Sequence, residues 1–362
     1  MKRRDFMARG ASGALGVGLA GCSTFNPKIY EINEPGETPL ELEKKVPKPV
    51  GTMPMGEIGT TGMMVSRFGF GSHIRPYFRP YTKEREWMVR EAYDFGINFF
   101  DMYDKEHEAY QYEPMGRYLA PIIHDVLISI APLPYDGRTF EQEFERDVKI
   151  FGKGHIDLVR IHMYTADSKD WWQWETLFKY KEQGKIRAVG VPIHSPKDLY
   201  PVIETYPLDF VILPYNFYHN WYGMKPQDFD PVITDLHKKG IGVITMKPHL
   251  GDRLAGPFMK MAAHYDETGE VVLAKADLRY IINSRVAIDS TLCGMMNPYH
   301  LYENIDAYFH PEMSDAEKKL LKKLREVAKI NNITKNLLPD HYQFLEDLVP
   351  DSWDDSDLFV TV

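Results

Sequence analysis

Carboxylate and imidazole side chains follow several short apolar runs of this 362-residue chain. Asp101 ends the run INFFD and is followed by Glu106 and His107, His162 ends IDLVRIH, and His194 comes shortly after IRAVGV. Enzymes use these groups for general acid–base catalysis, and divalent metals take them as ligands. Because neither an HxH nor an HExxH spacing is present, the pattern predicts a polar ligand site and leaves its chemistry open.

The elements that must position these residues are apolar runs separated by amphipathic segments. The runs lie at 67–72, 97–101, 126–131, 156–162, 186–191, 210–215, 241–247 and 290–294. Helix-like stretches lie at 83–94, 140–151, 169–183, 196–204, 229–239, 270–283 and 298–308. Eight strands that alternate with helices predict an α/β fold, the (β/α)8 TIM barrel, in which functional groups gather at the carboxyl ends of the strands. No GxGxxG follows the first run, which disfavours a doubly wound dinucleotide fold.

The N-terminus reads as a targeting segment. Residues 1–22 have a basic start and then a small-residue run too short to span a bilayer. Arg3 and Arg4 resemble a twin-arginine export signal, and LAGC, which ends at Cys22, resembles a lipobox whose cysteine becomes lipidated. These motifs predict an exported protein of the cell envelope, held to the membrane through a lipid anchor.

Three further segments follow the predicted signal. Residues 23–55 are rich in proline and charge and predict a tether, and residues 56–310 form the predicted barrel. Residues 311–362 predict a C-terminal helix and an acidic tail, and Ser314 with Glu317 three residues on predicts a capping box at the start of that helix.

Composition excludes several classes of function. The formal net charge is −9 and no basic stripe is present, so nucleic acid is not an expected partner. Once Cys22 is lipidated, Cys293 is the remaining cysteine, which excludes an intrachain disulfide and an iron–sulfur cluster.

Several segments, in order, resemble the aldo/keto reductases over about residues 55–308. GEIGTTGMMVSRFGFGS is similar to that family's hairpin and first strand, FGINFFD to its second strand, and GHIDLVRIH to its fourth. WETLFKYKEQGKIRAVGV is similar to the fourth helix and fifth strand, and GMMNPYHLYENI to the last phosphate-side loop and helix. The resemblance implies a TIM barrel that transfers hydride between a nicotinamide cofactor and a carbonyl or hydroxyl group of a small molecule.

The family's catalytic groups carry over in part. In that family a tyrosine donates the proton, a lysine and an aspartate tune it, and a histidine orients the carbonyl oxygen. Asp101 matches the aspartate and His162 the histidine, but Glu106 stands at the tyrosine's position and Ala131 at the lysine's. Burial beside Asp101 is expected to raise the pKa of Glu106, which suits an acid–base role. Asp101, Glu106 and His162 are therefore the predicted catalytic residues.

Two tyrosines and a surface role for Glu106 remain as alternatives at this site. Tyr103 and Tyr110 are off register, although a rearranged loop could bring one of them in. Glu106 also lies in the polar run DKEHE, where a solvated side chain is the simpler interpretation.

The cofactor site shows the same division. The family anchors the nicotinamide carboxamide through Ser-Asn and Gln and stacks an aromatic ring on it. Those positions are Pro192, Ile193, Ile212 and Met246 in this chain. Proline and isoleucine have no side-chain hydrogen-bonding group.

The adenosine-phosphate side follows the family pattern better, which keeps NADP as the expected cofactor. The residues predicted to bind it are Lys247, Gly294, His300, Glu303 and Asn304. Lys247 lies in a Met-Lys-Pro sequence typical of one branch of the family, some members of which carry an iron–sulfur domain that this chain lacks the cysteines for. Lys247 could contact a cofactor phosphate or an anionic substrate, or form an ion pair with Asp101 or Glu106.

Three functions fit these residues. The first is a lipid-anchored oxidoreductase of aldo/keto reductase type with a non-standard site and a carbonyl or hydroxyl substrate, such as a sugar. The second is a metal-assisted or acid–base lyase, isomerase or hydrolase acting on carbohydrate. The third is a ligand-binding lipoprotein without catalysis.

Overall fold

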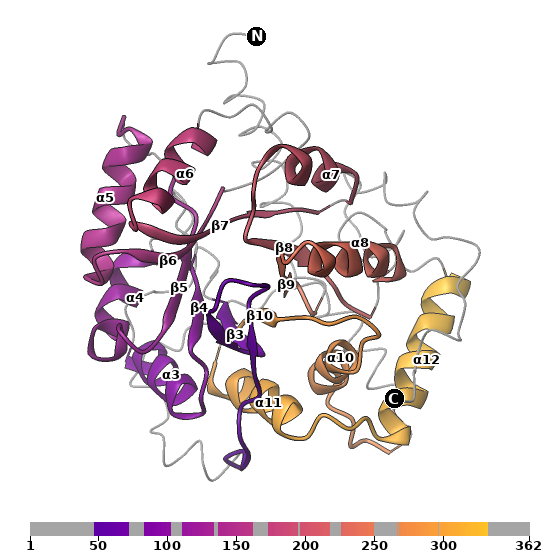
Figure 1. Ribbon diagram of the computed structural model, residues 1–362. Helices are drawn as coiled ribbons and strands as arrows, with labels where there is room; N and C mark the ends of the chain where they lie inside the picture. The colour runs from indigo at the N-terminus through magenta and orange to yellow at the C-terminus, as the bar shows by residue number, and fades with distance from the viewer. Residues whose placement is uncertain are drawn as a thin grey trace.

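The computed structural model describes residues 47–71, 83–102, 111–133, 137–161, 173–194, 196–217, 226–249, 266, 268–295 and 297–331. Within these residues eight parallel strands close into a barrel in chain order, and β10 pairs with β3 (Figure 1). The strands are β3 (Phe68–Gly71), β4 (Phe99–Asp101), β5 (Leu127–Ile130), β6 (Ile156–Arg160), β7 (Ile186–Pro192), β8 (Phe210–Pro214), β9 (Gly242–Met246) and β10 (Ser290–Gly294). The predicted (β/α)8 TIM barrel is confirmed.

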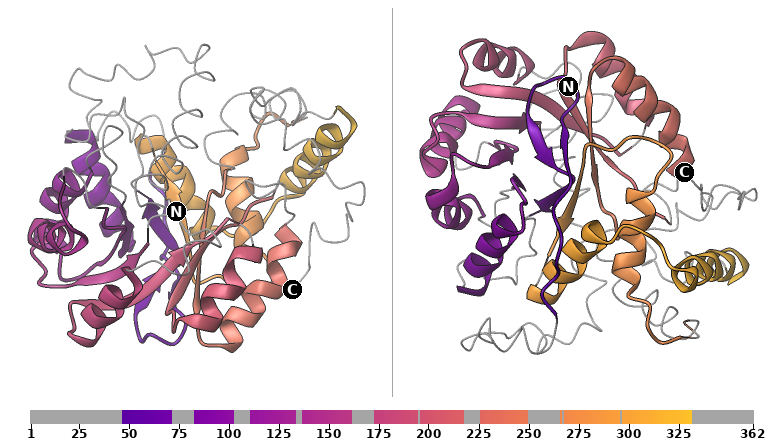
Figure 2. Two further views of the ribbon diagram at one scale, coloured as in Figure 1. Left: turned by 90° about the horizontal axis from the view of Figure 1, so that it is seen from above. Right: turned by 60° about the horizontal axis from the view of Figure 1, so that its bottom comes forward.

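Helices surround the strands in all three views (Figure 2). They are α3 (Lys83–Asp94), α4 (Tyr112–Leu119), α5 (Phe140–Phe151), α6 (Gln173–Glu182), α7 (Pro196–Thr205), α8 (Pro226–Lys238), α10 (Leu273–Ile282), α11 (Pro298–Phe309) and α12 (Asp315–Asn331). A short 3-10 turn, η2 (Ala120–Ile122), follows α4.

Side-chain alternation along the strands produces two apolar layers. Phe99, Leu127, Leu158 and Phe210 belong to a cluster inside the barrel, whereas neighbouring residues such as Ile128 join the larger cluster under the helices. Strands of a TIM barrel are buried on both faces, which explains why they read as continuous apolar runs. Any polar residue with the parity of the interior cluster must therefore have a partner inside the barrel.

β1 (Met55–Glu57) and β2 (Met64–Ser66) form the hairpin that the family resemblance implied, and this hairpin covers the amino end of the barrel. Ile58, Met63 and Val65 of this hairpin are buried in the interior cluster. Thr60 donates its backbone N–H to the carbonyl of Gly240, just before β9. The carboxyl ends of the strands, where Asp101 ends β4 and Arg160 ends β6, lie at the opposite end of the barrel.

Helix α4 differs from the sequence prediction. The helix-like stretches read from the sequence include none directly after β4, whereas the structure has a helix that begins at Tyr112 and has Gly116 in its middle. A Cβ at Gly116 would lie 2.7 Å from the carbonyl oxygen of Ile150 in α5. The glycine thus allows α4 and α5 to approach closely, which outweighs its poor helix propensity.

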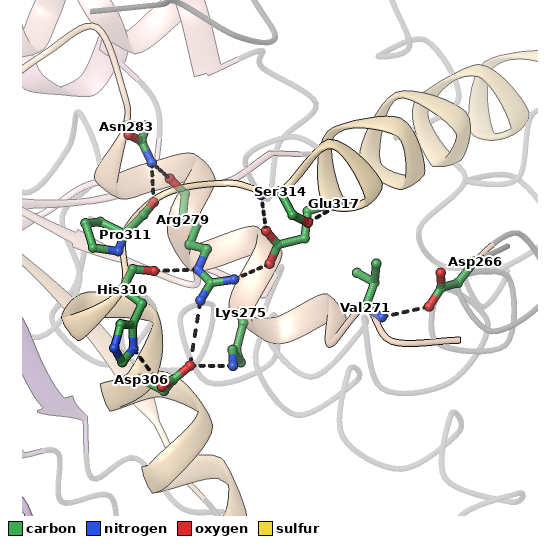
Figure 3. Close-up of polar contacts among 10 residues, drawn as sticks. All are labelled: Asp266, Val271, Lys275, Arg279, Asn283, Asp306, His310, Pro311, Ser314 and Glu317. Carbon is green, nitrogen blue, oxygen red and sulfur yellow. Dashed lines mark hydrogen bonds and ion pairs between the residues drawn. The ribbon is translucent and has the colours of Figure 1, made fainter. Parts of the chain in front are cut away.

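The C-terminal helix α12 packs on the barrel through the buried side chains of Leu320, Leu321 and Leu324, and Arg279 adds polar contacts (Figure 3). Arg279 of α10 donates from Nε to the His310 carbonyl at 2.8 Å and from Nη1 to Glu317 Oε1 at 2.5 Å. Glu317 also forms the predicted capping box with Ser314: the Glu317 N–H donates to the serine hydroxyl at 3.1 Å, and the Ser314 N–H donates to Glu317 Oε2 at 2.7 Å. This capping box is confirmed.

The end of the segment expected as a tether contacts the barrel. Pro49 and Met53 are buried, and Lys48 forms an ion pair with Glu91 at 2.5 Å. In the described part of the chain, no helix is long and apolar enough to cross a membrane.

Candidate active site

An ion pair lies inside the carboxyl end of the barrel. Arg160, the last residue of β6, donates from Nη2 to both carboxylate oxygens of Asp101, at 3.1 and 3.0 Å, and from Nε to Oδ1 at 3.3 Å. Ser129 of β5, between these two strands, donates its hydroxyl to Asp101 Oδ1 at 2.6 Å. The Asp101 side chain is 14% exposed and that of Arg160 is 7% exposed. A half-buried carboxylate is thus held by a buried guanidinium and a hydroxyl.

The strand register explains why these three residues meet. Asp101 pairs with Ser129 across β4 and β5, and Ser129 pairs with Leu158 across β5 and β6. Leu158 belongs to the interior cluster, so Arg160, two residues further along β6, points inward as well. An extended arginine can then reach past the small serine to the carboxylate.

Sequence reasoning did not single out Arg160. The signal was present, because arginine is the one charged side chain that shares the interior parity of the run IDLVRIH. A charge at such a position needs a partner of opposite sign, and Asp101 ends another strand of the same barrel. Among the described residues, the ion-pair partner of Asp101 is Arg160 and not Lys247.

The end of β5, where the family has its lysine, is occupied by Ala131. This residue is fully buried, and its backbone N–H donates to the hydroxyl of Tyr112 at 3.0 Å. The same hydroxyl donates to the carbonyl of Ala131 at 3.1 Å. Tyr112 therefore fastens α4 to the end of β5.

Several predicted residues fall outside the described part of the chain. They are Cys22, Tyr103, Glu106, His107, Tyr110 and His162. The catalytic roles of Glu106 and His162 and the lipidation of Cys22 stay predictions.

The positions that anchor the nicotinamide in the family are buried and apolar. Ile193 is 0% exposed and Ile212 2% exposed, and Pro192 is also buried. The backbone N–H of Ile193 donates to the carbonyl of Ile212 at 2.8 Å, while Met246 is half-buried. The proline and the two isoleucines supply no side-chain hydrogen bond to a carboxamide.

Lys247, just after β9, turns toward β7. Its Nζ lies 2.7 Å from Nε2 of His194. Its φ of 59° places it in the left-handed region, which is uncommon for a residue with a side chain. The side-chain amide of Asn216 donates to the Lys247 carbonyl at 3.2 Å. Burial, and then the charge of Lys247, lower the pKa of His194 to about 3.

The predicted adenosine-phosphate residues lie at the end of β10 and on α11. Gly294 is exposed, and His300 and Glu303 are more open than Asn304, which is 2% exposed. The amide of Asn304 donates to the buried thiol of Cys293 at 3.4 Å. Burial raises the pKa of Glu303, against the opposing effect of Lys275 and His249.

His249 adds a polar group at this end that the sequence prediction did not assign to the cofactor. Its Nδ1 lies 3.3 Å from Asp277 Oδ2. Its Nε2 is buried and has no hydrogen-bond partner among the described residues. Burial lowers the pKa of His249, but the nearby Cys293 and Asp277 outweigh burial and raise it to about 10.

The described residues therefore fit a nicotinamide dinucleotide unevenly. The adenosine-phosphate end offers the orphaned Nε2 of His249 and the exposed Gly294. The carboxamide end lacks the family's hydrogen-bonding side chains. Across the described ranges, no group of three or more His, Cys, Asp or Glu is arranged to hold a metal ion.

Comparison with known proteins decides the family. The aldo/keto reductase family model matches residues 70–338. The chain belongs to the aldo/keto reductase family of oxidoreductases. It is 26% identical over 308 residues to L-galactose dehydrogenase of Arabidopsis thaliana, with 76% of this chain and 95% of that protein covered.

Solved structures of aldo-keto reductases share the fold. The holo form of an enzyme from Bacillus halodurans has a TM-score of 0.62 at 17% identity, over 75% of this chain and 96% of that one. A thermostable aldo-keto reductase solved with the inhibitor epalrestat has a TM-score of 0.59 at 18% identity, over 75% of this chain and 100% of that one.

Proposed function

We propose that this chain is an exported, lipid-anchored oxidoreductase that acts on a carbonyl or hydroxyl group of a small molecule, with a sugar as the favoured substrate. One observation carries the proposal: in a barrel of a reductase family, Asp101, the residue that we match to the family's aspartate, ends a strand, is 14% exposed and forms an ion pair with Arg160. The likeness to L-galactose dehydrogenase supports a sugar as the substrate.

The cofactor in this proposal is NADP, held mainly through its adenosine-phosphate end. His249, Gly294, His300 and Glu303 would contact that end, and when bound the cofactor supplies or accepts the hydride. Lys247 lies closer to the nicotinamide side, as its contact with His194 indicates. Neither isoleucine of the carboxamide positions can orient the ring by hydrogen bonding, so at these two positions the ring would be held by shape.

The proposed catalytic groups are Asp101, Glu106 and His162, with Arg160 as a positioning residue. The guanidinium keeps a permanent positive charge, because arginine does not lose its proton in proteins. Arg160 can therefore balance the charge of Asp101, but it cannot donate the proton to the substrate oxygen. Glu106 is the proposed donor of that proton, and His162 would orient the oxygen.

Export and anchoring rest on the N-terminal motifs. Arg3-Arg4 supports the twin-arginine route, which carries folded proteins and so permits a cofactor loaded before export. Cys22 supports lipidation. We propose that residues 23–55 form a tether and that residues 311–362 form the C-terminal helix and tail. The cell envelope is the proposed location.

A ligand-binding lipoprotein without catalysis is a second candidate. The apolar carboxamide positions favour it, because they remove the anchors that hold nicotinamide in a reactive position. Titration with NADPH separates it from an oxidoreductase.

A turnover assay tests the proposed function. The purified protein is mixed with NADP⁺ or NAD⁺ and a panel of sugars that includes L-galactose, and reduced nicotinamide is followed by absorbance. We expect at least one sugar to reduce the nicotinamide slowly, with a rate that saturates with sugar concentration. The Asp101→Asn variant should lose this activity. Equal rates in the wild type and Asp101→Asn would contradict a role for this site.

A further inference from the structure

The ion pair at the carboxyl end of the barrel uses only part of the Arg160 guanidinium. A guanidinium carries five N–H donors in one plane. Arg160 meets Asp101 with one side of that plane, through Nε at 3.3 Å and through Nη2 at 3.1 and 3.0 Å. Nη1 lies on the edge of the plane that faces away from this carboxylate. Among the residues that the structure describes, Nη1 has no hydrogen-bond partner.

Burial makes these unused donors costly. The Arg160 side chain is 7% exposed, so bulk water reaches little of it. A buried N–H group without a partner loses the hydrogen bonds that water would give it, and such groups are few in folded proteins. The two N–H groups of Nη1 therefore need an acceptor that the described residues do not supply.

The fold places the same donors where barrel enzymes bind their ligands. Asp101 ends β4 and Arg160 ends β6, with β5 between them (Figure 1), and substrates of TIM-barrel enzymes bind at this end of the strands. On β5, Ser129 bonds to Asp101, and Ala131 has the same parity but adds only a methyl group. Strand β5 thus leaves room for the guanidinium at the barrel mouth.

The ion pair also orients Nη1 before a ligand arrives. Three bonds to Asp101 hold the plane of the guanidinium, and the Ser129 hydroxyl, at 2.6 Å, holds the carboxylate. A donor that is already oriented loses little conformational freedom when a ligand binds. It can also stabilise negative charge that develops on a bound oxygen.

The position of Asp101 argues for an uncharged ligand oxygen. An acceptor bonded to Nη1 lies one guanidinium width from the Asp101 carboxylate. Two negative charges at such a separation in a buried site repel each other. A carbonyl or hydroxyl oxygen accepts the same hydrogen bond without this repulsion.

We propose that Nη1 of Arg160 binds an uncharged carbonyl or hydroxyl oxygen of the substrate at the barrel mouth, so that the protein selects neutral sugars over sugar acids. Arg160 then contacts the substrate in addition to positioning Asp101. The inference rests on the proposed function for the sugar as substrate, whereas the donor itself follows from the contacts of Arg160.

NMR of the arginine side chains in the full-length protein tests the contact directly. Isotope-labelled arginine makes the guanidinium signals visible, and Arg160→Lys assigns the Arg160 signals by their absence. D-Galactose, L-galactose and D-galacturonate, which carries a carboxylate on the galactose ring, are titrated in turn. We expect at least one galactose to shift the Arg160 signals saturably. The Arg187 signals are the internal control and should stay in place, because Arg187 pairs with Asp157 near the amino ends of β7 and β6.

Affinities of variants separate ligand binding from the positioning of Asp101. Arg160→Met removes a charged hydrogen bond to the ligand, which corresponds to roughly a 10- to 100-fold loss of galactose affinity. Arg160→Lys keeps a positive charge beside Asp101 but offers one nitrogen in place of three, so it should lose most of this affinity too. Asp101→Asn removes the repulsion and should raise galacturonate affinity about ten-fold. Arg187→Met, the matched control, should bind all three sugars as the wild type does.

Each outcome decides for or against the contact. Galactose binding that leaves the Arg160 signals in place, or that is equally tight in Arg160→Met, overturns the inference and leaves the proposed function standing. Galacturonate binding that is tighter than galactose binding in the wild type contradicts the selection of neutral sugars. Galactose binding through Arg160 in a protein that binds neither NADPH nor NADH keeps the contact and overturns the proposed function. Binding of none of the three sugars refutes the inference, whatever the cofactor titration gives.

Discussion

Removing the guanidinium of Arg160 is the sharpest test of the buried pair in the barrel mouth. In Arg160→Met the Asp101 carboxylate keeps the Ser129 hydroxyl, at 2.6 Å, and loses all three bonds to the arginine. Breaking a buried ion pair by removing one partner typically costs 3–5 kcal/mol. Because the Asp101 side chain is still 14% exposed, water solvates part of the charge, and we expect the lower end, about 3 kcal/mol.

A double-mutant cycle isolates the pair from the other effects of each substitution. Asp101→Asn leaves the arginine charge unpaired and is also expected to cost about 3 kcal/mol, whereas Asp101→Asn with Arg160→Met leaves a neutral site. The double variant should then lie within roughly 1–2 kcal/mol of the wild type, which gives a coupling energy of several kcal/mol. Urea unfolding followed by tryptophan fluorescence measures each free energy. Additive single effects, or single costs below about 1 kcal/mol, would refute the buried pair.

Further predictions concern the histidine, the end of β5 and the C-terminal helix. The pKa of His194 is about 3 in the folded protein against 6.5 for an ordinary histidine, so its contribution to stability is complete above pH 6.5 and is lost as pH falls. At pH 5 the loss is about 2 kcal/mol, and His194→Asn should flatten this part of the stability–pH curve; an unchanged curve would contradict the assignment. Tyr112→Phe removes the hydroxyl that bonds both backbone groups of Ala131, and we expect urea unfolding to show roughly 1–3 kcal/mol of destabilisation. An unchanged free energy of unfolding would show that water replaces the hydroxyl and would contradict this role. Arg279→Met removes the contacts to His310 and Glu317, so α12 should become cleavable by limited proteolysis before the barrel unfolds, and cleavage at wild-type rates would argue against this attachment.

Local sequence pattern predicted most of the elements that position the site. The runs at 126–131 and 290–294 became β5 and β10, and the stretches 83–94 and 140–151 became α3 and α5 with the same bounds. The spacing of apolar residues reflects which face of an element is buried, so helices and strands that bury a continuous face can be predicted from the sequence. Helix α4 was not among the predicted stretches, because its start has no side-chain cap and Gly116, a poor helix former, lies in its middle.

The residues of the site were easier to predict from the sequence than the contacts between them. Asp101 was predicted from its place at a strand end, but its bond to Arg160 depends on the stagger of β4, β5 and β6, which only the closed barrel sets. The bond between Lys247 and His194 depends on a positive φ at Lys247. Glycine or asparagine is the usual sequence signal for a positive φ, and this position has neither. The sequence pattern predicts which side chains of a strand point to the same face. These two contacts also depend on how neighbouring strands are aligned, which only the three-dimensional structure shows.

The most direct test of the central claim is calorimetric titration of the purified protein with NADPH and then NADH. An oxidoreductase that keeps the adenosine-phosphate end of its site should bind at least one of them saturably, with micromolar or tighter affinity. No detectable binding of either cofactor would contradict the oxidoreductase assignment for this chain and favour a ligand-binding lipoprotein.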